Sequence, residues 1–171
     1  MEDYLDILRR LFLIDEIPAY SSGLRSNIRV GKLPKRHLVD YSLALASLDI
    51  SEKKMMDDLV TFGYIFESLC LHDLKVYAHI NDGEIYHYRD YNNNEIDAIV
   101  EMDNRKVAIE IKLNANQIDN AAKSLISINK KISSKNDNKG FDALCIICGM
   151  QDYAYKREDG VYVVPITVLK N

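Results

Sequence analysis

Three ionisable side chains stand on two neighbouring apolar segments between residues 95 and 113. Asp97 lies near the start of the first segment, and Glu110 and Lys112 stand two residues apart on the second. Because side chains alternate along a strand, Glu110 and Lys112 project from the same face. The polar sequence MDNRK between the segments predicts a hairpin that brings all three side chains to one end of a sheet. Their desolvation is costly, and a divalent cation with a phosphodiester would offset that cost.

A further carboxylate comes from the preceding helical segment, YIFESLCLHDL, in which Glu67 shares a stripe with small and apolar residues. If this helix packs on the sheet, Glu67 approaches Asp97 and Glu110, and a Mg²⁺ or Mn²⁺ ion would stabilise the three ionised groups. In this hypothesis Asp97, Glu110 and the carbonyl oxygen of Ile111 ligate the metal. Glu67 completes the coordination directly or through water. Lys112 orients or deprotonates the attacking water and stabilises charge on the phosphoryl oxygens.

The alternative for the same residues is an internal ion pair. Lys112 would then pair with Asp97 or Glu110, and Glu67 would face the solvent. Gln117 follows the Lys112 strand closely and is a candidate contact to a phosphate or to the attacking water.

The order of predicted elements indicates an α/β fold with a mixed central sheet flanked by helices. Three consecutive antiparallel strands precede a helix, and further strands follow it. The continuous apolar run FDALCIICG predicts a central strand buried on both faces, and Asp159-Gly160 marks the turn of a final hairpin. The predicted helices span residues 55–77, apolar on almost all sides and therefore buried, and residues 115–132, which are amphipathic.

We divide the chain into an N-terminal segment, residues 1–50, and a main domain, residues 51–171. The first has the helix, strand, loop and strand of a partial winged-helix unit, with its second extended run around Ile28 and Val30. Residues 23–38 contain five basic residues and no acid, which form either a solvated or domain-docking surface or a contact to phosphates. These residues are Arg25, Arg29, Lys32, Lys35 and Arg36.

The composition excludes several classes of protein. A net charge of −4 argues against a protein that coats nucleic acid by charge alone. The sequence has no long uncharged apolar stretch and its first residues are too charged for a signal peptide, so we expect no membrane association. Three cysteines in apolar settings favour the reducing cytoplasm. Cys145 and Cys148 would point to opposite faces of a strand, which favours packing over metal or redox chemistry.

The block of Asp97, Glu110 and Lys112, with Glu67 on the preceding helix, resembles the PD-(D/E)xK nuclease superfamily, which has the restriction-endonuclease-like fold. A more specific resemblance extends over nearly the whole chain. It links the sequence to the domain of unknown function at the C-terminus of many bacterial and archaeal AAA-type ATPases. The segments that carry it are YLDILRRLFLIDEIPAYS, PKRHLVDYSLAL, FGYIFESLCLHDLKVYA, EIYHYRDYNNNEIDAIVE, AIEIKL and KREDGVYVVPI.

This resemblance implies a PD-(D/E)xK nuclease-like domain over residues 51–171, and an ATPase domain ahead of Met1. The sequence itself contains no G-x-x-x-x-G-K-[ST] motif, so we expect no ATP site of that kind in this chain. The first functional hypothesis is a Mg²⁺- or Mn²⁺-dependent endonuclease that acts on nucleic acid, most simply DNA. The second is a non-catalytic DNA-binding or regulatory module of the ATPase, in which the acidic pocket is vestigial.

Overall fold

The computed structural model describes residues 2–20, 33–134 and 139–169. Its main feature is a six-stranded mixed sheet in the order β3-β4-β5-β6-β8-β7. Strands β3, β4 and β5 are antiparallel, β5, β6 and β8 are parallel, and β7 returns antiparallel to β8. The strands are β3 Glu84–Arg89, β4 Glu95–Met102, β5 Arg105–Lys112, β6 Ala143–Cys148, β7 Tyr155–Lys156 and β8 Tyr162–Pro165. The predicted mixed α/β sheet is confirmed.

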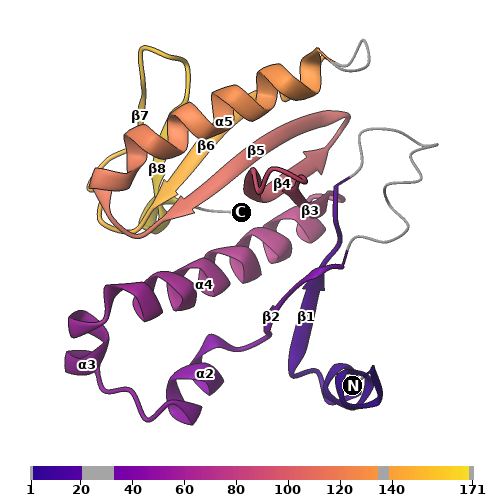
Figure 1. Ribbon diagram of the computed structural model, residues 1–171, viewed down its shortest axis with the longest axis vertical. Helices are drawn as coiled ribbons and strands as arrows, with labels where there is room; N and C mark the ends of the chain where they lie inside the picture. The colour runs from indigo at the N-terminus through magenta and orange to yellow at the C-terminus, as the bar shows by residue number, and fades with distance from the viewer. Residues whose placement is uncertain (1, 21–32, 135–138, 170–171) are drawn as a thin grey trace.

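One long helix covers each face of this sheet (Figure 1). Helix α4, Leu59–Ile80, buries Phe66, Cys70 and Leu71 against one face. Helix α5, Ile118–Ser133, buries a stripe at helical spacing against the other face, as its amphipathic pattern predicts. Because α5 connects the parallel strands β5 and β6, it forms the crossover that such a pair requires. A short 3₁₀ turn, η2 Ala115–Gln117, leads into α5.

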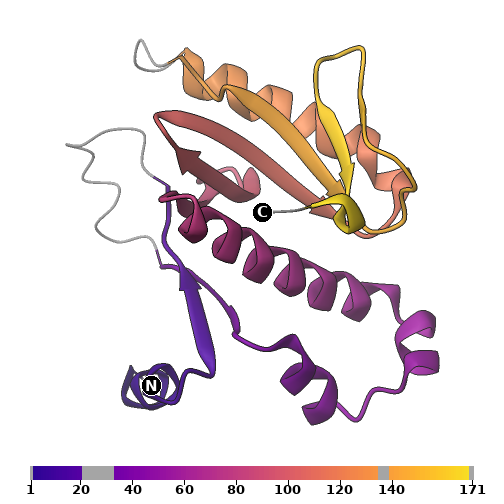
Figure 2. The same ribbon diagram turned by 180° about the vertical axis from the view of Figure 1, so that it is seen from behind.

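The described part of the N-terminal segment is a helix followed by a separate two-stranded antiparallel sheet and further helices (Figure 2). The segment after β1 joins the edge of the main sheet, because the His87 amide donates to the Pro18 carbonyl and the Tyr20 amide donates to the His87 carbonyl. The elements are α1 Glu2–Arg10, β1 Ile14–Ile17, β2 Lys35–Leu38, α2 Tyr41–Ser47 and α3 Glu52–Asp57. The extended run predicted around Ile28 and Val30 lies outside the described residues.

The prediction of one helix over residues 55–77, buried all round, is wrong in two respects. The helix is interrupted at Asp58, whose carboxylate accepts hydrogen bonds from the amide and hydroxyl of Thr61 and so begins α4. An aspartate in this position satisfies the free amides of a helix start. One side of α4 is also open, since Val60 and Tyr64 are more than two-thirds exposed.

Other local predictions are confirmed. Gly160, at a φ of +89°, turns the chain between β7 and β8, a conformation that glycine adopts without strain. Cys148 packs in the core beneath α5, whereas Cys145 packs against the core beneath α4, as expected for residues three apart in a strand.

A last 3₁₀ turn, η3 Ile166–Val168, follows β8. None of the helices in the described ranges has the length and apolar character needed to cross a bilayer.

Candidate functional site

Four carboxylates and two ammonium groups gather where the start of β4 meets the end of β5. Glu95 and Asp97 come from β4, Glu110 and Lys112 from β5, Glu67 from the middle of α4, and Lys35 from the start of β2. Six charged groups from four elements are thereby joined by a chain of ion pairs. Asp97 is its central member, because both lysines contact its carboxylate.

An irregularity in β4 directs Asp97 into this cluster. Tyr86 pairs with Ile99 and Tyr88 pairs with Ile96, so Asp97 and Ala98 together lie opposite His87 alone. Such a bulge re-aims side chains and is common beside functional sites. One carboxylate oxygen of Asp97 accepts a hydrogen bond of 2.9 Å from the amide of Ile111 in β5. The side chain is therefore fixed between the two strands.

Glu110 and Lys112 project from the same face of β5, as their spacing predicts, and form an ion pair. Lys112 Nζ lies 2.6 Å from Glu110 Oε2 and 3.5 Å from Asp97 Oδ2. Burial raises the pKa of Glu110 to about 8, and the nearby negative charge of Asp97 acts in the same direction against the attraction of Lys112. Burial also raises the intrinsic pKa of Asp97, but Lys112 and Lys35 outweigh it and the pKa lies below its ordinary value. One acid of this pair is thus held ionised while its neighbour favours the proton.

Lys35 is the member of the cluster that sequence reasoning placed elsewhere. Its Nζ lies 2.5 Å from Glu67 Oε1, 3.3 Å from Asp97 Oδ1 and 3.4 Å from Glu95 Oε1. Burial alone would lower the pKa of Lys35, but Asp97 and Glu67 reverse this and raise it, so the ammonium stays charged. Burial and Asp97 raise the pKa of Glu67 despite the opposing effect of Lys35. The cluster therefore already binds one cationic group between three carboxylates.

The donor set fits a hard divalent cation, since carboxylate oxygens are the preferred ligands of Mg²⁺ and Mn²⁺. With all groups ionised, four carboxylates face two ammonium groups, which leaves an excess of two negative charges. The described residues nevertheless contain no group of three or more His, Cys, Asp or Glu side chains already arranged around a common metal position. Binding of an ion by Asp97 and Glu110 would thus require the lysines and carboxylates to rearrange.

Comparison with known proteins assigns most of the chain to a family. Residues 62–169, well over half of the chain, match the family described as Domain of unknown function (DUF4143). The chain belongs to the DUF4143 family. Residues 1–54 match a second family, described as Domain of unknown function (DUF8612). No curated protein and no solved structure matches the chain.

All four acidic and basic residues predicted for the site of this DUF4143 chain lie in the cluster. An ion pair of Lys112 with Asp97 or Glu110 was predicted, and Lys112 contacts both acids. The orientation of Glu67 toward solvent, expected in that alternative, is wrong, because the Glu67 side chain is 24% exposed and pairs with Lys35. Ile111 contributes its amide to Asp97, and its carbonyl oxygen was the predicted ligand.

The residues predicted to contact nucleic acid do not form one surface in the described part of the chain. Arg36 pairs with Glu16 in β1, and the side-chain oxygen of Gln117 accepts a hydrogen bond from the amide of Asn114 at the start of η2. Arg25, Arg29 and Lys32 lie outside the described residues. Lys35 and Glu95 are the members of the cluster that the sequence did not place there. For Glu95, the only indication in the sequence was its spacing of two residues from Asp97. Lys35 is separated from Asp97 by 62 positions, so no local spacing connects them.

Two hollows adjoin the cluster. One, of about 430 Å³, is lined by Glu110 and Lys112 together with polar residues of η2 and α5: Asn116, Gln117, Asn120 and Ser124. The other, of about 410 Å³, is lined by Lys35 and Glu95 together with Pro34, His87, Arg89 and Tyr91. Glu110 and Lys112 are therefore open to one hollow, and Lys35 and Glu95 to the other.

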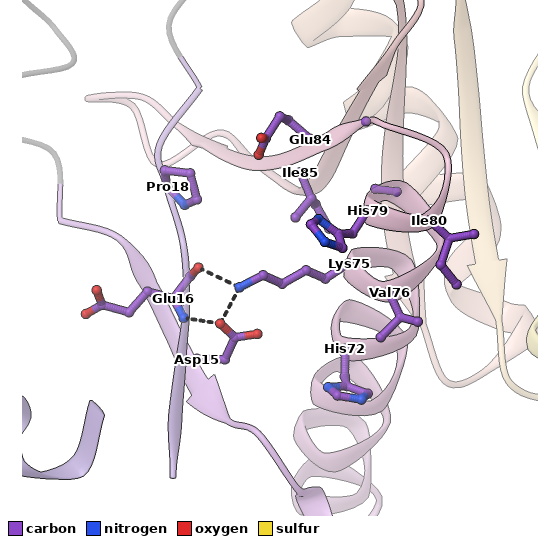
Figure 3. A pocket seen from close by; sticks show the side chains of 12 residues that line it. Asp15, Glu16, Pro18, His72, Lys75, Val76, His79, Ile80, Glu84 and Ile85 are labelled. Carbon is purple, nitrogen blue, oxygen red and sulfur yellow. Dashed lines mark hydrogen bonds and ion pairs between the residues drawn. The ribbon is translucent and has the colours of Figure 1, made fainter. Parts of the chain in front are cut away.

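A third hollow, of about 500 Å³, lies between β1 and the second half of α4 and shares no lining residue with the acidic cluster. Figure 3 shows Lys75 of α4 reaching across it to the carboxylate of Asp15 and the carbonyl oxygen of Glu16. This ion pair ties the N-terminal two-stranded sheet to α4 independently of Lys35.

Proposed function

We propose that this DUF4143 domain is a nuclease-like domain that binds Mg²⁺ or Mn²⁺ at the acidic cluster and hydrolyses phosphodiester bonds of nucleic acid, with DNA as the first substrate to test. The observation that carries the proposal is the convergence of Asp97, Glu110 and Lys112 at one sheet end, where negative charge is in excess when both acids are ionised. A charge excess buried in protein is stabilised by a multivalent cation. The polar hollow beside Glu110 and Lys112 gives a substrate access to the same groups.

In this proposal the acids hold the ion and Lys112 acts on the substrate or the attacking water. Asp97 and Glu110 hold the ion with the carbonyl oxygen of Ile111, and Glu67 completes the set directly or through water. A bound divalent ion would polarise the phosphoryl group and acidify a water molecule. Lys112 stabilises charge on the phosphoryl oxygens or positions the attacking water. An ATPase domain ahead of Met1 and a location in the cytoplasm belong to the same proposal and rest on the sequence resemblance.

A nuclease assay tests this function. Supercoiled plasmid, linear duplex, single-stranded DNA and RNA are incubated with the protein and Mn²⁺, and the products are separated on gels. We expect cleavage that disappears with EDTA and falls by at least about a hundredfold in Asp97→Asn and Lys112→Met. Glu158→Gln, which changes an exposed acid of the β7–β8 turn, serves as the control and should cleave normally. Cleavage that persists in both site variants would contradict the proposal.

A second function is favoured by the occupancy of the cluster by its own lysines. Because Lys35 and Lys112 already pair with the four carboxylates, the cluster can act as a structural ion-pair network. The domain would then be a non-catalytic DNA-binding or regulatory module of an ATPase. This function predicts no cleavage of any substrate in the same assay and a loss of thermal stability in Asp97→Asn.

A further inference from the structure

The ammonium group of Lys35 stands where a cation shared by Glu67 and Asp97 would have to stand. It lies 2.5 Å from Glu67 Oε1 and 3.3 Å from Asp97 Oδ1, with Glu95 Oε1 at 3.4 Å on a further side. A divalent ion bound to carboxylate oxygens would lie about 2.0–2.6 Å from them. A metal ion and the Lys35 ammonium therefore cannot both occupy the space between Glu67 and Asp97.

We propose that Lys35 is a built-in competitor of the divalent cation, and that the space between Glu67 and Asp97 becomes available to metal only when Lys35 swings out. This inference rests on the proposed function and adds its regulation. Lys35 belongs to the N-terminal segment, whereas the carboxylates belong to α4 and β4. The N-terminal segment thus controls the charge of a site that lies in the DUF4143 match.

The structure provides a path for the exchange. Lys35 is the first residue of β2 and lines the 410 Å³ hollow together with Glu95, so its ammonium can leave the carboxylates by rotation of its own side chain. The side chain has four flexible methylene groups, and its head is strongly hydrated when exposed. The backbone of β2 can stay in place, since the Lys75–Asp15 ion pair and the pairing of β1 with β2 hold it.

Repulsion between like charges favours exchange over simple addition. When all six groups are ionised and Lys35 is in place, four carboxylates and two ammonium groups leave an excess of two negative charges. Replacing the single charge of Lys35 by a divalent ion lowers the excess to one. Leaving Lys35 in place would instead bring a dication within a few ångströms of an ammonium group, where like charges repel strongly in a partly buried setting.

Two measurements on the 171-residue chain test this inference. The first compares Mn²⁺ binding by isothermal titration calorimetry in the wild type, in Lys35→Met and in Lys75→Met. Lys75→Met is the matched control, because Lys75 also ties the N-terminal sheet to α4 but contacts no carboxylate of the cluster. We expect Lys35→Met to bind Mn²⁺ about tenfold or more tightly than the wild type, and Lys75→Met to bind as the wild type does.

The second measurement uses only the wild type and so does not depend on whether a variant folds. Surface lysines are acylated with a limiting reagent, and the modified positions are quantified by mass spectrometry with and without Mn²⁺. We expect Mn²⁺ to raise the acylation rate of Lys35 several-fold, because its ammonium is displaced from Glu67 and Asp97, and to leave that of Lys75 unchanged, because Lys75 contacts no carboxylate of the cluster.

The outcomes separate this inference from the function on which it rests. Equal Mn²⁺ affinity in the wild type and Lys35→Met, with no change in Lys35 acylation, overturns the competitor role and leaves the metal site standing. Tighter binding to the same extent in both lysine variants also overturns it, since loosening of the N-terminal sheet would then be the cause. Absence of Mn²⁺ binding in all three proteins overturns the competitor role and the proposed metal function together.

Discussion

Glu110→Gln should stabilise the protein at neutral pH, although the carboxyl group that it replaces lies 2.6 Å from the Lys112 ammonium. Burial and the neighbouring Asp97 raise the pKa of Glu110 from its ordinary value of 4.5 to about 8. Between these two values the unfolded chain is ionised at this position while the folded chain retains the proton. The unfolded state then binds fewer protons than the folded state, so the free energy of unfolding falls as the pH rises through this window. An amide has the shape of the carboxylic acid and cannot ionise.

The size of the effect follows from one proton. The free energy of unfolding of the wild type can fall by about 1.4 kcal/mol for each pH unit between the two pKa values, or by about 2.7 kcal/mol between about pH 5 and pH 7. Glu67 also has a raised pKa, so the free energy of unfolding still depends on pH in Glu110→Gln. The difference between the wild type and Glu110→Gln isolates the contribution of Glu110. The lowered pKa of Asp97 affects stability only below its ordinary value of 3.8, outside this window.

The assay is urea unfolding of the wild type and Glu110→Gln at several values between about pH 5 and pH 8, without divalent ions. We expect the stability of Glu110→Gln relative to the wild type to grow by about 2–3 kcal/mol from about pH 5 to pH 7. Glu158→Gln, at an exposed position, should keep the pH dependence of the wild type. Parallel curves for the wild type and Glu110→Gln would refute the argument that Glu110 is protonated in the folded chain.

Two other predictions concern the core. His37 is buried with neither ring nitrogen hydrogen-bonded among the described residues, and burial lowers its pKa. In His37→Leu the thermal midpoint at neutral pH should stay level or rise. The loss of stability as the pH falls below about 6.5 should be smaller than in the wild type, because a buried neutral histidine must charge on acidification. A thermal midpoint several degrees lower at neutral pH would contradict this. Leu71→Ala should lower the free energy of unfolding in urea by about 2–5 kcal/mol, since Leu71 is 1% exposed under the sheet. Leu59→Ala, at a position 44% exposed, should lower it by less than about 1 kcal/mol. Equal losses in the two variants would show that α4 is buried on both sides.

Much of the sheet could be predicted because its signals are local. Each signal lies within a few positions of the structure that it specifies. These signals are the turn residues between β4 and β5, the two-residue spacing of Glu110 and Lys112, and the Asp159-Gly160 turn. Residue spacing likewise placed Cys145 and Cys148 on opposite faces of β6. Such features depend on backbone periodicity and turn chemistry, which a single sequence contains.

The features that were missed depend on competition or on distant contacts. Asp58 interrupts an otherwise continuous helical pattern because its side chain caps Thr61, and the Asp-x-x-Thr spacing was an available signal for this break. The bulge that turns Asp97 into the cluster depends on its pairing with β3. The position of Lys35 depends on how the N-terminal sheet packs beside α4 and β4, which no local pattern in residues 23–38 encodes.

The most direct test of the metal site is a crystal structure of the wild type soaked in Mn²⁺, with anomalous diffraction recorded at the manganese absorption edge. We expect one strong anomalous peak about 2.0–2.6 Å from carboxylate oxygens of Asp97 and Glu110, with the Lys35 ammonium moved away from Glu67. Manganese found only on unrelated surface carboxylates, with Lys35 still seated between Glu67 and Asp97, would contradict it.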